Sequence, residues 1–200
     1  VTAIVGRMDI SLSGKVALIT GGSRGIGLAI AKSYAESGAQ VMITSRKEDS
    51  LREAAKFVGG DAAYLAGNAG DTEFAQKCVS ATLEKFGKID IFVNNAATNP
   101  YAGPTLGVSE AQFDKTFQVN LRGPLFWCSQ VWDQHMKDNP GVIINIASVG
   151  GIRAEGNLGV YNLTKAALIH LTRQLAGELG LTRVVGIAPG LVKTDFAQML

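Results

Sequence analysis

The sequence predicts an α/β fold in which a doubly wound parallel sheet is covered by helices on both faces, giving three layers. Short apolar runs alternate with longer amphipathic segments over the whole chain. The apolar runs are hydrophobic at nearly every position, as expected of strands buried on both faces. The connections are short and no linker or repeat interrupts them, so we expect one domain over residues 1–200.

Six apolar runs, rich in β-branched residues, are the predicted strands. They cover residues 15–20, 39–45, 62–67, 89–95, 141–148 and 182–189. Five amphipathic segments between them are the predicted helices. They cover residues 25–37, 47–57, 71–86, 109–136 and 160–179. Two helix starts are recognisable, because Asp71 is a residue type that caps helices and SEAQ at 109–112 spells a capping box.

The composition is that of a globular protein and excludes several classes of function. The net charge is +2 with both signs interspersed, which gives no nucleic-acid-binding surface. No apolar stretch reaches the roughly 18 residues of a membrane span, and VTAIVGRMDISLSG at the start is too short and polar for a signal peptide. Cys78 and Cys128 lack metal-site or redox spacing, which indicates packed thiols in a reducing compartment. We expect a soluble cytoplasmic protein without a metal site.

A glycine-rich turn, TGGSRGIG at residues 20–27, follows the first predicted strand and opens the first helix. Gly21, Gly25 and Gly27 would let the backbone approach a pyrophosphate, and the helix start would supply free N–H groups. The spacing differs from the common G-x-G-x-x-G, and a tight turn without a ligand is the alternative interpretation. The position between strand and helix favours a dinucleotide site.

The end of the second predicted strand indicates which dinucleotide binds. An NAD site usually has an acidic residue there for the ribose 2′-hydroxyl, whereas this chain has Ser45, Arg46 and Lys47. Arg46, with Arg24 of the glycine turn, could grip a 2′-phosphate. Either arginine alone could be an ordinary surface residue, but together with the missing acid they predict NADP(H) in preference to NAD(H).

The stretch YNLTK places Tyr161 and Lys165 one turn apart on the same face of a predicted helix. One interpretation is a solvated lysine stem that lies on an aromatic ring. The other is a cation that prepares the phenol to move a proton, because a phenol with a pKa near 10 is a poor base at neutral pH.

Several motifs in sequence order resemble the short-chain dehydrogenase/reductase family. They are TGGSRGIG, NNAA at 94–97, Asn120, Ser148, Tyr161-x-x-x-Lys165, and the pair PG at 189–190 with Thr194. The resemblance extends over residues 13–195 and implies a Rossmann-type fold with NAD(P)-dependent oxidoreductase activity.

The same resemblance implies a role for each catalytic position. Tyr161 would donate a proton to a substrate carbonyl during reduction, and Lys165 would lower the phenol pKa and bind the nicotinamide ribose. Ser148 would orient the carbonyl, and Asn120 would hold a water that links Lys165 to solvent. Without the resemblance, Ser148 could simply cap a strand end and Asn120 could be an ordinary hydrogen-bonded helix residue.

The resemblance further implies a set of cofactor contacts, in which Asn68 meets the adenine and the residues after the sixth strand meet the carboxamide. The complete set is Gly21, Ser23, Arg24, Gly25, Ile26, Gly27, Ser45, Arg46, Asn68, Asn94, Ala96, Ile146, Tyr161, Lys165, Pro189, Gly190, Val192 and Thr194.

Two departures from the family pattern are visible. Ala97 stands where the family commonly has Gly, which would cost up to about 1 kcal/mol if the backbone there needs positive φ. The chain ends at Leu200, where family members usually continue with a substrate lid, another helix and a seventh strand. We therefore expect an incomplete C-terminal part, with cofactor affinity better preserved than turnover.

SRK at 45–47 and NNAATNP at 94–100 resemble 3-oxoacyl-acyl-carrier-protein reductases and related broad carbonyl reductases. The resemblance to the carrier-protein reductases implies NADPH-dependent reduction of a carrier-bound carbonyl in fatty acid biosynthesis. The alternatives are a broad-specificity carbonyl reductase or alcohol dehydrogenase, and a cofactor-binding scaffold without turnover. The helices at 109–136 and 160–179 carry apolar residues on more than one face, which predicts a homodimer or homotetramer through them. The alternative is that both helices are buried within one chain.

Overall fold

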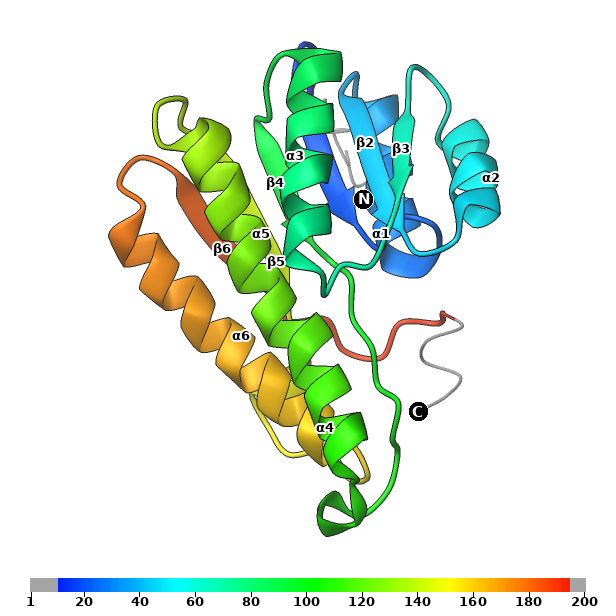
Figure 1. Cartoon of the computed structure of the whole chain (residues 1–200), viewed down its shortest axis with the longest axis vertical. Helices are drawn as coiled ribbons and strands as arrows, with labels where there is room; N and C mark the ends of the chain where they lie inside the picture. The colour runs from blue at the N-terminus through cyan, green and yellow to red at the C-terminus, as the bar shows by residue number, and fades with distance from the viewer. Residues whose placement is uncertain (1–10, 195–200) are drawn as a thin grey trace, which may run out of the picture.

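Six parallel strands form one sheet in the order β3-β2-β1-β4-β5-β6 in the computed structural model, which describes residues 11–194 (Figure 1). The strands are β1 (Val16–Thr20), β2 (Gln40–Ser45), β3 (Ala63–Ala66), β4 (Ile91–Asn94), β5 (Val142–Ile146) and β6 (Arg183–Ile187). Each lies within one of the predicted apolar runs, and all neighbouring strands pair in parallel. The predicted doubly wound parallel sheet is therefore confirmed.

The helices begin and end close to the predicted residues. They are α1 (Gly25–Glu36), α2 (Glu48–Val58), α3 (Thr72–Phe86), α4 (Glu110–Phe117), α5 (Gly123–Val131) and α6 (Gly159–Glu178). Short 3₁₀ turns at Thr105–Gly107 and Val149–Gly151 precede α4 and α6. The predicted caps are present: the Asp71 carboxylate accepts from the Glu73 and Phe74 amides, and Ser109 forms a capping box with Gln112.

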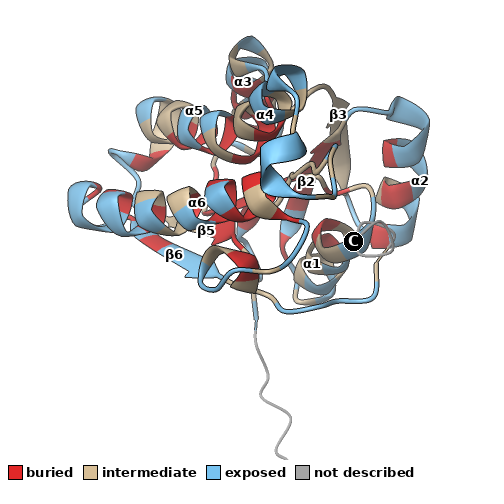
Figure 2. Ribbon diagram, turned by 90° about the horizontal axis from the view of Figure 1, so that it is seen from below, coloured by how far each residue is buried: buried red, intermediate tan, exposed pale blue. Residues whose placement is uncertain are grey.

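The alternation of side chains along β1 assigns the helices to the two faces of the sheet. Leu18 packs in a cluster with residues of α3, α5 and α6, whereas Ala17 and Ile19 pack with residues of α1 and α2. Since successive side chains of a strand point to opposite faces, these two groups of helices form separate layers (Figure 2). Every residue of β1 is buried, which explains its continuous apolar run.

The segment predicted as one helix over 109–136 is helical throughout but contains two wider, π-helical turns. Gln118–Arg122 precedes α5 and Trp132–Met136 follows it. Pro124, in the first turn of α5, has no amide hydrogen to offer to the carbonyl of Asn120 four residues earlier. This missing bond accounts for the wide turn around Asn120, since π-helical turns appear where regular α-helical bonding is interrupted.

The strand order places a crevice at the carboxyl edge of the sheet. β1 lies between β2 and β4, so the chain winds away from it in two directions, and ligands of such sheets bind at this reversal. Because all six strands are parallel, the loops that follow them gather along the same edge. Among residues 11–194, no helix has the length and apolar character needed to span a membrane.

Candidate active site

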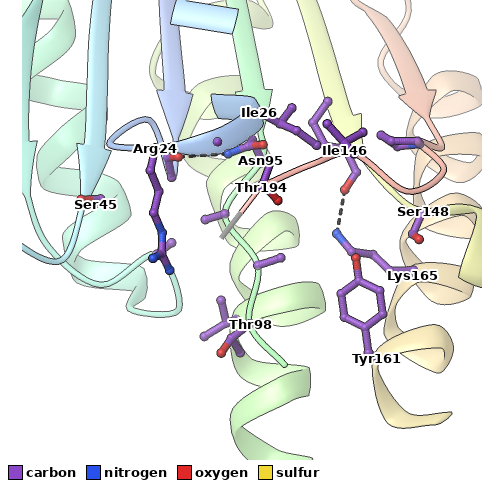
Figure 3. Close-up of a pocket in the computed structure, with 18 of the residues that line it drawn as sticks. Arg24, Ile26, Ser45, Asn95, Thr98, Ile146, Ser148, Tyr161, Lys165 and Thr194 are labelled. Atoms are coloured by element: carbon purple, nitrogen blue, oxygen red, sulfur yellow. Dashed lines mark hydrogen bonds between the residues drawn. The ribbon is translucent and has the colours of Figure 1, made fainter. Parts of the chain in front are cut away.

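A cavity of about 770 Å³ runs along the carboxyl edge of the sheet, where the loops after all six strands meet (Figure 3). Most of the predicted site residues line it. They are Gly21, Ser23, Arg24, Gly25, Ile26, Ser45, Arg46, Asn68, Ala96, Ile146, Ser148, Tyr161, Lys165, Pro189, Gly190, Val192 and Thr194. Gly27, Asn94 and Asn120 are the predicted site residues that do not line it.

The glycine turn has the shape required to receive a pyrophosphate. Gly21 and Gly25 have φ of +67° and +55°, a region that side chains disfavour. A Cβ at Gly25 would meet only the Thr194 side chain, at 3.4 Å, so the backbone here is open to a ligand. Helix α1 begins at Gly25 with no side-chain cap on its first N–H groups. A dinucleotide fits these features, because helix starts of this kind bind phosphate through backbone N–H groups.

Asn95 fastens the glycine turn to the end of β4. Its Nδ2 donates to the carbonyl oxygens of Thr20 and Gly21 at 2.9 and 3.1 Å, and its backbone N–H donates to the Thr20 hydroxyl at 3.0 Å. A Cβ at Gly27 would lie 2.4 Å from Asn95 Nδ2, so Gly27 serves this clamp and does not face the cavity. Asn95 itself lines the cavity, although the sequence interpretation assigned it no role.

Asn94 lies on the other side of β4, inside the helical layer. Its Nδ2 donates to Asn145 Oδ1 at 2.9 Å, and Asn145 Nδ2 donates to the Thr172 hydroxyl of α6 at 2.9 Å. Both asparagines are buried, and they are paired in the register of β4 and β5. Asn94 is thus linked to α6 through Asn145, and its Nδ2 also donates to the Pro124 carbonyl and Cys128 Sγ of α5.

One end of the cavity is basic. Arg24, Ser45, Arg46 and Lys47 line it where β1 and β2 end, and no acidic residue among the described lining residues lies at these two strand ends. Asn68 lines the cavity after β3, and its Oδ1 accepts from the Gly70 amide at 3.1 Å. An anionic group on the ribose would meet cations here, which is the chemistry of a 2′-phosphate site.

Ser148, Tyr161 and Lys165 meet at another part of the same cavity (Figure 3). The Ser148 hydroxyl accepts from the Gly150 amide at 3.1 Å and lies close enough to the Tyr161 phenol to lower its pKa. Lys165 Nζ donates to the carbonyl oxygen of Ile146 at 2.7 Å and lies 5.6 Å from the centre of the Tyr161 ring. Lys165 is only 2% exposed, so the interpretation as a solvated lysine stem is wrong.

Burial is the main cause of the pKa shifts of Lys165 and Tyr161. It lowers the pKa of Lys165 from 10.5 to about 8, because an ammonium loses its hydration when buried. It raises the pKa of Tyr161, an effect opposed by the Ser148 hydrogen bond and reinforced by the negative charge of Glu155. The phenol is therefore protonated at neutral pH, in the state needed to donate a proton.

Asn120 is fully buried and holds the loop after β4 in place. Its Oδ1 accepts from the Thr98 amide at 2.8 Å, and its Nδ2 donates to the Thr98 carbonyl at 2.9 Å and the Thr164 hydroxyl at 3.2 Å. Thr164 precedes Lys165 on α6. With both ends of its side chain bonded to protein, Asn120 would have to bind the expected water through its backbone carbonyl.

Ala97 lines the cavity without the strain considered for it. Among residues 11–194, Asn157 is the only residue other than glycine with positive φ, at 62°. The cost of placing alanine at this turn therefore does not arise. Within the same range, no group of three or more His, Cys, Asp or Glu side chains is arranged to hold a metal ion.

The sequence interpretation missed Glu155 and Leu158, which line the cavity from the loop between β5 and α6. The available signal was a carboxylate six residues before Tyr161, in a loop that must return to the site. Sequence patterns could not show that this loop folds back beside Ser148, because its course depends on the distant segment around Gly103, which bonds to Asn157.

Comparisons with known proteins agree with this geometry. Residues 15–200 match the protein family described as short chain dehydrogenase. The chain is 40% identical over 193 residues to Dehydrogenase/reductase SDR family member 4 of Caenorhabditis elegans, covering 94% of this chain and 74% of the relative. It is 38% identical over 193 residues to human Dehydrogenase/reductase SDR family member 2, mitochondrial, covering 94% of this chain and 69% of the relative.

A solved structure shows the same similarity. The crystal structure of 3-ketoacyl-(acyl-carrier-protein) reductase from Brucella melitensis complexed with NADH matches with a TM-score of 0.90 and 36% sequence identity. The match covers 94% of this chain and 80% of the solved chain, which is longer.

Proposed function

Because the chain belongs to the short-chain dehydrogenase/reductase family, it is an NAD(P)-dependent oxidoreductase, and we propose that it reduces a carbonyl group to an alcohol with NADPH. The observation that carries the proposal is the approach of the Ser148 hydroxyl to the Tyr161 phenol beside the buried Lys165, within a cavity that fits a dinucleotide. A nucleotide-binding scaffold would need the glycine turn but would not need these three side chains together.

Each side chain has a step in the reduction. The bound nicotinamide dinucleotide supplies the hydride. The Tyr161 phenol donates its proton to the carbonyl oxygen. The Ser148 hydroxyl, held from behind by the Gly150 amide, donates a hydrogen bond to the same oxygen and orients it. The Lys165 ammonium stabilises the phenolate that remains until Tyr161 is protonated again.

The variant Tyr161→Phe tests the proposed reaction. We expect kcat to fall by at least about 100-fold, because the proton donor is lost, while the Kd for NADPH stays within about twofold. Tyr34→Phe is the matched control, since Tyr34 is half-buried in α1 outside the cavity lining and should keep full activity. Undiminished function in Tyr161→Phe would support the scaffold hypothesis instead.

The preference for NADPH is supported by Arg24, Arg46 and Lys47 around the end of β2. The similar Brucella reductase was crystallised with NADH, so the preference rests on these residues alone. We expect Arg46→Ala to raise the KM for NADPH by about tenfold, since it removes a charge-assisted hydrogen bond to the 2′-phosphate, and to leave the KM for NADH unchanged. Equal or better kcat/KM with NADH in the unaltered protein would contradict the proposal.

The proposed substrate is a 3-oxoacyl thioester on an acyl carrier protein, as in fatty acid biosynthesis. Support comes from the match to a 3-ketoacyl-(acyl-carrier-protein) reductase at a TM-score of 0.90. A broad-specificity carbonyl reductase or alcohol dehydrogenase is the second candidate, because Ser148, Tyr161 and Lys165 act on the carbonyl and place no demand on a carrier. Higher kcat/KM for simple ketones than for an acetoacetyl thioester would favour this second candidate.

We also propose that the protein acts as a homodimer or homotetramer in the cytoplasm. Exposed apolar side chains on α4, α5 and α6 support the assembly. Cys78 and Cys128 are buried free thiols, which suits a reducing compartment. The human relative carries the word mitochondrial in its name, so fractionation of cells that express the full protein is the test of location.

A further inference from the structure

Glu155 places a carboxylate beside the catalytic hydroxyls. It lines the cavity together with Ser148, Leu158 and Tyr161, and its side chain is 33% exposed. Its Oε2 lies 3.1 Å from the point that a Cβ on Gly150 would occupy, and the Gly150 amide is the group that holds the Ser148 hydroxyl. The charge of Glu155 also reaches Tyr161, whose pKa it raises.

The loop that carries Glu155 is fixed on both sides. Asn162 of α6 donates through its Nδ2 to the backbone carbonyl of Glu155 at 3.1 Å. The Gly103 amide donates to the carbonyl of Asn157 at 2.9 Å, and Gly103 forms a bridge with Leu158. The backbone that carries the carboxylate is therefore held in place by the fold.

The charge of Glu155 is poorly compensated. Arg153 lies 4.0 Å away and is 75% exposed, and such a pair contributes little in water. Lys165, the one buried cation among the described residues, donates to the Ile146 carbonyl. Glu155 is the only acidic residue among the described residues that line the cavity. The Asn162 Oδ1 acceptor also lies beside the Gly150 position, and no donor among the described residues bonds to it. Glu155 therefore has a second hydrogen-bond acceptor near it and, within the described part of the chain, no donor that offsets its charge.

We propose that Glu155 is a specificity residue that admits neutral carbonyl substrates and rejects those with an anionic group close to the reacting carbonyl. A 3-oxoacyl thioester and a free 3-oxo acid differ in this respect, because the acid carries a carboxylate two bonds from the carbonyl. Glu155 thus makes the enzyme act on esterified acyl groups and spare the free acids. The inference rests on the proposed carbonyl reduction and deepens it.

The test compares methyl acetoacetate with acetoacetate, which share the reacting carbonyl and differ in charge. We expect the unaltered enzyme to have a kcat/KM at least about tenfold higher for the ester, as like charges a few ångströms apart near a protein surface repel to this extent. In Glu155→Gln the ratio of the two kcat/KM values should fall about tenfold, through a gain for acetoacetate. Because both substrates are measured on the same sample, the ratio is independent of the folded fraction.

Two variants serve as controls. Glu155→Asp keeps the charge and should keep the preference for the ester. Glu84→Gln removes an exposed carboxylate of α3 outside the cavity lining and should leave the ratio unchanged. Reduction of the ester with an unchanged ratio in Glu155→Gln, or a preference of the unaltered enzyme for acetoacetate, would overturn the inference alone. No NADPH oxidation with either probe would overturn the proposed function and the inference together.

Discussion

Lys165 shows how much a single side chain depends on its surroundings. In YNLTK it is an ordinary cation one turn from a tyrosine, whereas in the fold it is buried and bound to the carbonyl that ends β5. That bond places the ammonium against the Tyr161 ring, 5.6 Å from its centre. If Tyr161 gives up its proton as proposed, the lysine would stabilise the resulting phenolate at close range and in a dry environment, where such an interaction is strong.

The buried lysine predicts a pH-dependent stability. The pKa of Lys165 falls from 10.5 to about 8 on folding because of burial. Between these pH values the unfolded chain binds more protons than the folded one, so the free energy of unfolding rises with pH. Below about pH 8 Lys165 is charged in both states, and the full free-energy cost of burying the ammonium lowers the stability.

Urea unfolding of the cofactor-free protein measures this effect. Between about pH 7 and about pH 9.5, the protein should gain about 2 kcal/mol of unfolding free energy relative to Lys165→Met, which has no charge to lose. A constant difference between the two proteins over this range would contradict the burial of a charged lysine.

At the scale of elements, the site depends on how closely the glycine turn, which joins β1 to α1, packs against β2 and the end of β4. Thr20 and Asn95 bond the turn to the end of β4, and Gly22 packs so closely on β2 that a Cβ there would lie 2.7 Å from Ile43 Cβ. This closeness keeps the N-terminus of α1 at the cavity, where its N–H groups can meet phosphate. The glycines are thus required for packing, whatever ligand approaches them.

The same substitution at two glycines should therefore have opposite effects. In Gly27→Ala the new methyl would lie 2.4 Å from both Asn95 Nδ2 and the Gly21 carbonyl, so we expect a loss of roughly 1–3 kcal/mol in unfolding free energy. In Gly177→Ala, within α6, the methyl meets nothing within 4 Å, and we expect a gain of up to about 1 kcal/mol from helix propensity. Thermal or urea unfolding compares the two, and equal effects would argue against the close fit.

At the scale of the whole molecule, the helical layer of α4, α5 and α6 retains apolar surface. Phe113, Leu125, Phe126 and Leu163 are 38–54% exposed, whereas Trp127 and Val131 of the same layer are buried against the sheet. The alternative that both helices are wholly buried within one chain is therefore wrong for these side chains. An apolar helix face of this kind is typical of a subunit contact.

Two phenylalanines provide a matched test of the proposed assembly. Phe126 on α5 lies under Arg122, and Phe57 on α2 lies under Lys32, with cations 5.3 and 5.5 Å from the ring centres. We expect Phe126→Glu to convert a dimer or tetramer into smaller species in sedimentation velocity, because a buried unpaired charge opposes association. Phe57→Glu should leave the assembly intact. A monomeric unaltered protein, or dissociation by both variants, would contradict the proposed contact.

The sequence by itself determined what depends on short-range patterns. Runs that are apolar at nearly every position marked all six strands, including the edge strand β6, where Val185 and Ile187 are exposed. The caps at Asp71 and Ser109 were equally predictable. The glycine turn and the Tyr161–Lys165 spacing are also local, and a helix brings residues four apart together wherever it lies.

Only the tertiary structure decided which side chains reach the cavity. Asn94 ends β4, a strand with both faces buried, and Asn95 follows it. Periodicity therefore could not tell that Asn95 holds the glycine turn while Asn94 bonds Asn145. The approach of Glu155 to Ser148 depends on a loop fixed by Gly103 and Asn162. The burial of Lys165 likewise depends on α6 packing against β5, since burial and hydrogen bonding arise from segments far apart in the chain.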